Sequence, residues 1–171
     1  LGQAPDPKLV KHIRDKIMSY PGVLGVHDLM VHDYGPGRKF ASAHAEMAAE
    51  ADPLESHDTL DNIEQAFRNE GGMIVTLHYD PIVTDDPKVA SMRLRINAMA
   101  QQIDSRLSIH DLRCVPGPTH TNVIFDCVRP SDLQMSAEDL KRTLAKQVES
   151  EYPKSFAKIT IDEDYVGHTH E

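Results

Sequence analysis

Apolar and polar positions along the first half of the chain alternate between two spacings. Stretches with apolar residues three and four apart predict helices, and stretches rich in β-branched residues predict strands. Asp-Pro pairs open both helical stretches, and glycines close them, as is typical of helix ends. The predicted elements are a helix between Pro7 and Tyr20, strands at 23–33 and 39–48, a helix between Pro53 and Gly71, and a strand at 73–77.

The second half repeats this order of elements. Another Asp-Pro pair opens its first helix, and Ser136 with Asp139 forms a capping box at the start of its second. The predicted elements are a helix between Pro87 and Ile103, strands at about 107–115 and 120–129, a helix from about Ser136, and a strand at about 156–162. Each half is therefore expected to fold as α-β-β-α-β.

A short motif marks the repeat. His27-Asp28-Leu29 precedes a Gly-Pro turn, and His110-Asp111-Leu112 precedes another. A period of about 83 residues is too long for a solenoid, so the halves are interpreted as two copies of one domain. The predicted fold class is α+β, with two tandem ferredoxin-like α-β-β-α-β sandwiches. The predicted domains are residues 1–84 and a divergent repeat at 85–171.

Charge and composition narrow the classes of partner. The chain has 171 residues and a formal net charge of −9, which argues against phosphate-driven nucleic-acid binding and suits a cationic partner. No apolar run approaches the roughly 20 residues that a membrane helix needs, so we expect no membrane insertion by this fragment. The chain begins at Leu1 without an initiator Met, which suggests a piece of a longer protein. Cys114 and Cys127 are expected to be buried thiols.

Histidines concentrate in the first half at positions that the topology would bring together. His27 and His44 lie on the two arms of the first hairpin, and His78 and Asp80 lie two apart on the third strand. His57 lies on the intervening helix. Zinc is usually held by four ligands such as imidazole nitrogen and carboxylate oxygen. The five residues therefore predict a metal site, and two ions that share a ligand are plausible.

The order of these motifs resembles the cytoplasmic C-terminal domain of cation diffusion facilitator transporters. The resemblance covers residues 1–84, and residues 85–171 look like the extra C-terminal module of some members. The opening stretch, residues 1–7, also resembles the segment that follows the last membrane helix in this family. The motifs that carry it are Gly25-Val26-His27-Asp28-Leu29, Gly35-Pro36, His44 followed by Glu46, His57-Asp58, and His78-Tyr79-Asp80-Pro81.

The resemblance implies a regulatory part of a transporter. Members of this family are homodimeric, proton-coupled exporters of zinc and related divalent ions, with cytoplasmic domains that bind metal at the dimer interface. It implies a non-enzymatic domain at the cytoplasmic face of the cell membrane, attached to the transmembrane domain of the same full-length chain. Zinc fits best, and cadmium, manganese, cobalt, nickel and iron are alternatives. The family's ligands carry over to His27, His44, His57, His78 and Asp80, with His57 in the bridging role.

The second copy offers a set of candidate ligands with more carboxylate oxygens and fewer imidazole nitrogens. Aligning the hairpins places His110 at the position of His27 and Asp126 at that of His44. Aligning the third strands places Asp162 and Asp164 at the positions of His78 and Asp80, and the helix position of His57 has no obvious ligand. This set would suit manganese, iron or zinc with less selectivity. The alternative is a structural repeat whose carboxylates are solvated.

The other histidines are expected to be peripheral. From strand parity, His32 should face away from the cluster. His12 should lie on a helix surface, His120 on a turn, and His168 and His170 in a tail that binds metal adventitiously.

Two other functions compete with a metal-sensing dimerisation domain. One is a dimerisation module that needs no metal and in which the histidines are incidental. The other is a metallohydrolase, which the sequence supports least because it lacks His-Glu-x-x-His, Gly-x-Ser-x-Gly and phosphate-loop motifs.

Overall fold

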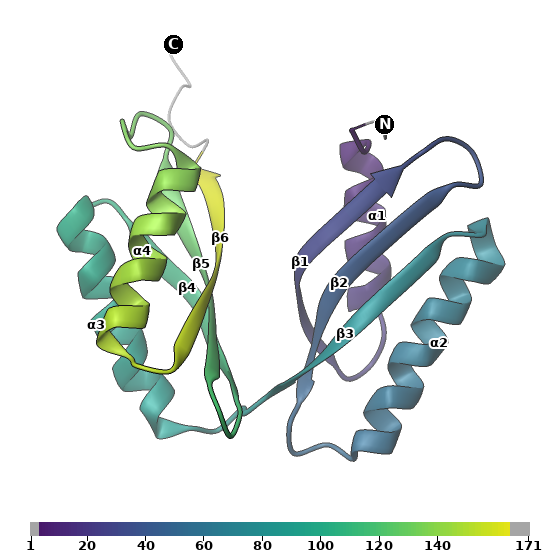
Figure 1. Ribbon diagram of the computed structural model, residues 1–171, viewed down its shortest axis with the longest axis horizontal. Coiled ribbons are helices and arrows are strands. Elements are labelled where there is room, and N and C mark those ends of the chain that lie inside the picture. Colours follow the sequence, from purple (N-terminus) through teal and green to yellow (C-terminus); the bar gives the residue numbers. More distant parts are fainter. Residues whose placement is uncertain (1–3, 165–171) are drawn as a thin grey trace, which may run out of the picture. The chain divides into compact units, whose positions relative to one another are not determined.

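The computed structural model describes residues 4–164 and divides into two compact units (Figure 1). Unit 1 is Leu1–Ile82 and unit 2 is Val83–Glu171. The tail that contains His168 and His170 lies outside the described residues. Within the described part of the chain, no helix is long and apolar enough to cross a membrane.

Unit 1 contains the five predicted elements in the predicted order. Their bounds are α1 Pro7–Met18, β1 Val23–Asp33, β2 Lys39–Ala48, α2 Pro53–Gly71 and β3 Ile74–Ile82. The Asp-Pro signals work as expected, because Asp6 and Asp52 accept hydrogen bonds from backbone N–H groups in the first turns of their helices. β3 runs five residues beyond the predicted end because it stays paired with β2 as far as Ile82.

The three strands of unit 1 form one sheet in the order β1-β2-β3 (Figure 1). β1 and β2 are antiparallel, and β2 and β3 are parallel, as a helical crossover through α2 requires. Alternate residues of β2, such as Ala41 and Ala43, form a core with Ile13 of α1 and Ile63 of α2. The opposite side of the sheet, which carries the other alternate residues, is called the outer face below. It includes His44, because strand side chains alternate between faces.

A β-bulge in β1 changes which residues reach the outer face. His27 pairs with His44, but the next pair is Met30 with Ser42, so two β1 residues oppose one β2 residue. Asp28 takes the left-handed conformation needed there, with φ of 51°. The bulge reverses the alternation, and His32 lies on the same face as His27. The expectation that His32 faces away is therefore wrong.

Unit 2 has the same topology, with the strand order β4-β5-β6. Its elements are α3 Pro87–Ile103, β4 Ser108–Pro116, β5 Thr121–Pro130, α4 Ala137–Glu151 and β6 Ser155–Asp164. The bulge also recurs, with Asp111 at φ 56°. The α+β fold class and the tandem repeat are confirmed. Cys114 and Cys127 are buried free thiols, and burial raises the pKa of each to about 11.

Candidate metal centre

Three imidazoles form a row across the outer face of unit 1. The register pairs His27 with His44 and His44 with His78. The ring centroids are 4.7 Å apart for the first pair and 4.6 Å apart for the second. Residues that face each other across neighbouring strands have close side chains. The pairing of the strands alone therefore brings together three of the predicted ligands.

Asp80 lies in the next row of the outer face and touches all three rings. Its Oδ2 is 3.2 Å from His27 Nε2 and 2.9 Å from His44 Nδ1, and its Oδ1 is 3.4 Å from His78 Nε2. Burial opposes ionisation of this carboxyl, but hydrogen bonds from His27 and His44 outweigh that cost and lower its pKa. A buried carboxylate thus lies beside the histidine row, within contact distance of all three rings.

His27 is buried between two carboxylates. Its Nδ1 is 3.0 Å from Glu46 Oε2, and its Nε2 faces Asp80. Burial alone would lower the pKa of His27, but the hydrogen bonds to Asp80 and Glu46 and the negative charge of both raise it to about 9. Without metal, His27 is therefore an imidazolium ion that neutralises part of the buried negative charge.

Two overlapping groups of residues have donor atoms close enough to hold an ion. In each group, one donor atom per residue lies within 4.8 Å of the others. One group is His44, His78 and Asp80, and the other is His27, Asp28 and His44. Sequence reasoning missed Asp28, because simple alternation directs it away from its neighbour His27. The recurrence of His-Asp-Leu in both halves was the only available signal of the bulge.

His57 is not in either group. It is exposed on α2, whose neighbouring residues Ser56 and Leu60 pack toward the core. That core lies on the side of the sheet opposite the outer face. Within one chain, the structure thus brings together four of the five predicted first-copy ligands.

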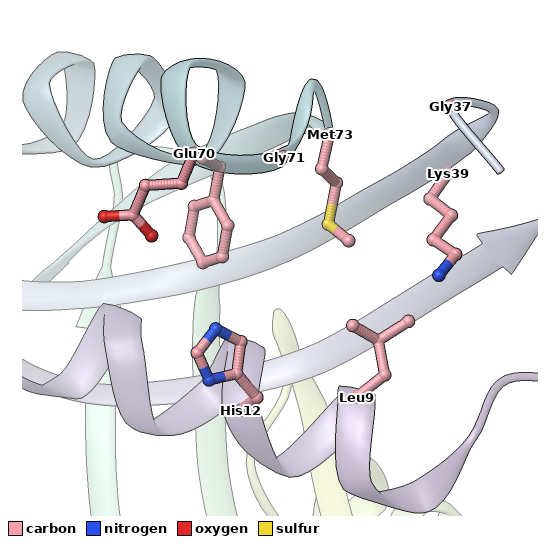
Figure 2. A pocket seen from close by; sticks show the side chains of 8 residues that line it. Leu9, His12, Gly37, Lys39, Glu70, Gly71 and Met73 are labelled. Atoms are coloured by element: carbon pink, nitrogen blue, oxygen red, sulfur yellow. The ribbon is translucent and has the colours of Figure 1, made fainter.

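The histidine row borders a hollow of about 520 Å³ on the outer face, lined in part by His44, His78 and Asp28. A separate hollow of about 310 Å³ lies between α1, the end of α2 and the β1–β2 turn (Figure 2). His12 points into this second hollow, opposite Glu70 and near Leu9. No group of three potential metal ligands lines it among the residues described.

The candidate ligands of unit 2 are spread over three rows. His110, Asp126 and Thr160 form the row that corresponds to the three imidazoles of unit 1. Asp162 lies in the row that corresponds to the aspartate ligand, and Asp164 lies one row further along the same face. The predicted alignment of the third strands is therefore wrong by two residues, because it did not include the pairing of β6 with β5.

Arg113 lies beside Asp126, the aspartate in the row of unit 2 that corresponds to the imidazoles of unit 1. The Nη1 of Arg113 is 3.7 Å from Asp126 Oδ1, and His110 Nε2 lies 3.0 Å from Ser108 Oγ. His120 lies in the turn between β4 and β5, where its Nδ1 is 2.9 Å from Thr119 Oγ1. No group of three potential ligands forms among the described residues of unit 2.

Comparison with known proteins gives a family match for unit 1. Residues 5–82 match the family described as "Cation efflux protein, cytoplasmic domain". This confirms the expected resemblance to the cytoplasmic domain of cation diffusion facilitator transporters, which lies in unit 1. Unit 2 lies outside the residues that the family matches.

The relatives are bacterial pumps. The cation-efflux pump FieF of Salmonella typhi is 39% identical over 72 residues, which are 42% of this chain and 24% of the relative. FieF of Escherichia coli K12 gives the same values. The chain thus spans about a quarter of the length of the curated relatives that it matches. Solved structures of the candidate zinc transporter CzrB match with TM-scores of 0.42 and, for the zinc form, 0.39. The first is 28% identical to this chain, and the match covers 46% of this chain and 98% of the CzrB chain. The zinc form is 26% identical, and the match covers 47% of this chain and 93% of the CzrB chain.

Proposed function

We propose that this chain is the metal-sensing and dimerisation part of a proton-coupled divalent cation efflux transporter, and that zinc is the ion it senses. The observation that carries the proposal is the row His27-His44-His78 with the Asp80 carboxylate against all three rings. Imidazole nitrogen and carboxylate oxygen are ligands that zinc prefers. We propose a regulatory role for this site and no catalytic one.

The spacing of the donor atoms supports a single ion held by His44, His78 and Asp80, whose donor atoms lie within 4.8 Å of one another. Ligand bonds of about 2.0–2.2 Å in a tetrahedron place the ligand atoms roughly 3.4 Å from one another. The nitrogen–oxygen distances from the three rings to Asp80 are already 2.9 to 3.4 Å. An ion held by His44, His78 and Asp80 would therefore need little movement of the backbone, and a movement of the His27 side chain would let it serve as the fourth ligand.

A second ion per chain would need further ligands. A neutral imidazole has one free lone pair, so His44 alone does not serve both three-residue groups at once. The Asp80 carboxylate has two oxygens and could bridge two ions. We propose Asp28 of the same chain and, in the dimer, His57 of the second copy as the additional ligands of such a second ion.

We propose that two copies associate through the outer face. Beside the histidines, this face exposes Met30, Phe40 and Ile74, and exposed apolar side chains that lie together often mark an interaction site. Two chains of −9 each would repel one another, since the dimer would carry twice that charge. Bound cations would offset this repulsion. In the full-length transporter, the closed dimer would couple metal on the cytoplasmic side to the packing of the transmembrane helices.

Calorimetry combined with sedimentation tests the proposal. We expect zinc to bind at pH 7.5 with at least one ion per chain and to shift the protein toward the dimer. His44→Ala should reduce the affinity at least 10-fold, while His32→Ala, a control on the same face, should not. A protein that dimerises without any binding of zinc, nickel or cadmium would be a metal-independent dimerisation module instead.

A further inference from the structure

Glu46 is a buried carboxylate directly behind the histidine row. It lies two residues after His44 on β2, pairs in register with Gly25 on β1 and Asp80 on β3, and is only 2% exposed. Its Oε2 lies 3.0 Å from the Nδ1 of His27. A carboxylate oxygen accepts hydrogen bonds, so this nitrogen must be the donor.

Gly25 provides the room for this carboxylate. A Cβ atom at position 25 would lie 2.8 Å from Glu46 Oε2 and 2.9 Å from both Cδ and Oε1. Distances this short exclude any side chain at position 25 while Glu46 keeps its place. The glycine therefore leaves the space in which the carboxylate lies across the backbone of β1.

Unit 2 shows that the fold does not need this pair. The residues at the positions of Gly25 and Glu46 are Ser108 and Val128, which face each other in the same register. The hairpin and its bulge form there all the same. In unit 2 the ring of His110 is exposed, and its Nε2 contacts Ser108. The glycine–glutamate pair thus occurs in the unit with the gathered imidazoles and is absent from the other.

We propose that Glu46 is a positioning residue for the metal centre, an inference that rests on the proposed metal-binding function. By accepting the Nδ1–H of His27, Glu46 holds the ring in one orientation and leaves Nε2 as the only nitrogen that can ligate an ion beside Asp80. A carboxylate that accepts the second N–H of a ligating histidine fixes the tautomer and increases the basicity of the ligand. Gly25 acts through Glu46 by leaving space for it.

Three variants test this assignment. Glu46→Gln keeps an acceptor oxygen and should bind zinc within a few-fold of the parent. Glu46→Val introduces the residue of unit 2 and removes the acceptor, so zinc affinity should fall about 10- to 100-fold. Gly25→Ser, also the residue of unit 2, should give a similar loss by displacing the carboxylate. Phe40→Leu, on the same face of β2 but away from His27, is the matched control.

The tautomer of His27 is the second readout, followed by ¹⁵N NMR of the zinc-loaded protein. We expect the proton on Nδ1 in the parent and in Glu46→Gln, and a mixture of ligation modes in Glu46→Val. Folded Glu46→Val and Gly25→Ser variants with parental affinity and the parental tautomer would overturn the inference. So would failure of both to fold, because Glu46 would then be structural. A parent that binds no zinc would instead refute the proposed function.

Discussion

At the scale of single residues, His27 sets the proton balance of the site. Its folded pKa of about 9 lies above the unfolded value of 6.5. A raised histidine pKa stabilises the folded state below the unfolded pKa, and this contribution is lost as the pH rises through the folded pKa. The metal-free protein should therefore lose stability between about pH 6.5 and 9. Thermal unfolding with chelator across that range measures this, and a melting temperature that stays constant or rises would contradict it.

The same protonation links zinc binding to proton release. Since an imidazolium has no free lone pair, His27 must lose a proton before it can ligate. At pH 7.5 we expect nearly one proton released per zinc on account of His27, and zinc affinity that keeps rising up to about pH 9. Calorimetry in buffers of different ionisation enthalpy measures the number of protons. No proton release at pH 7.5 would show that His27 is not a ligand.

His78 and Asp80 should respond differently to substitution. The side chain of His78 is 67% exposed, so His78→Ala should weaken zinc binding about 10-fold or more and leave metal-free stability within roughly 0.5 kcal/mol of the parent. Asp80 is buried against two imidazoles, and Asp80→Ala should also cost about 1–3 kcal/mol of metal-free stability. Denaturant unfolding with chelator distinguishes the two. Equal stability of both variants would contradict the central place of Asp80.

At the scale of elements, the sequence was informative wherever a signal was local. Asp-Pro pairs located both helix starts of unit 1, and the Gly-Pro turn located the β1–β2 hairpin. Signals that depend on pairing between strands were less accessible. The bulge at Asp28 reversed the face of His32, and the register of β6 moved Asp162 and Asp164 by two residues. Neither is encoded in the spacing of one strand, because both depend on which residue lies opposite.

The bulge itself can be tested at Asp28, which has a φ of 51°. Asp28→Gly should keep the fold, since glycine adopts this conformation without a Cβ clash, whereas Asp28→Val should cost about 1–2 kcal/mol. Chemical denaturation compares the two. If Asp28 supports a second ion, both variants should lose it while the first ion stays bound. Equal stability of the glycine and valine variants would show that the bulge is not strained.

At the scale of the whole molecule, the repeat was predictable, but the different chemistry of its two units was not. The sequence placed aspartates in unit 2 near the right positions, while only the strand register revealed Arg113 beside Asp126. The guanidinium supplies a permanent positive charge where unit 1 would use an ion. We infer that unit 2 is the structural copy of the pair.

A double substitution tests this inference. Asp126→Asn with Asp162→Asn should leave zinc stoichiometry and the zinc-induced rise in melting temperature as in the parent. A lower stoichiometry, measured by calorimetry, would establish a second, harder metal site in unit 2.

The most direct test of the central claim is an anomalous-scattering map from zinc-soaked crystals, recorded on both sides of the zinc absorption edge. We expect a peak on the outer face of unit 1, about 2.0–2.2 Å from donor atoms of at least three of the four residues His27, His44, His78 and Asp80. Peaks confined to other histidines, or a vacant outer face in crystals that hold zinc elsewhere, would contradict the account.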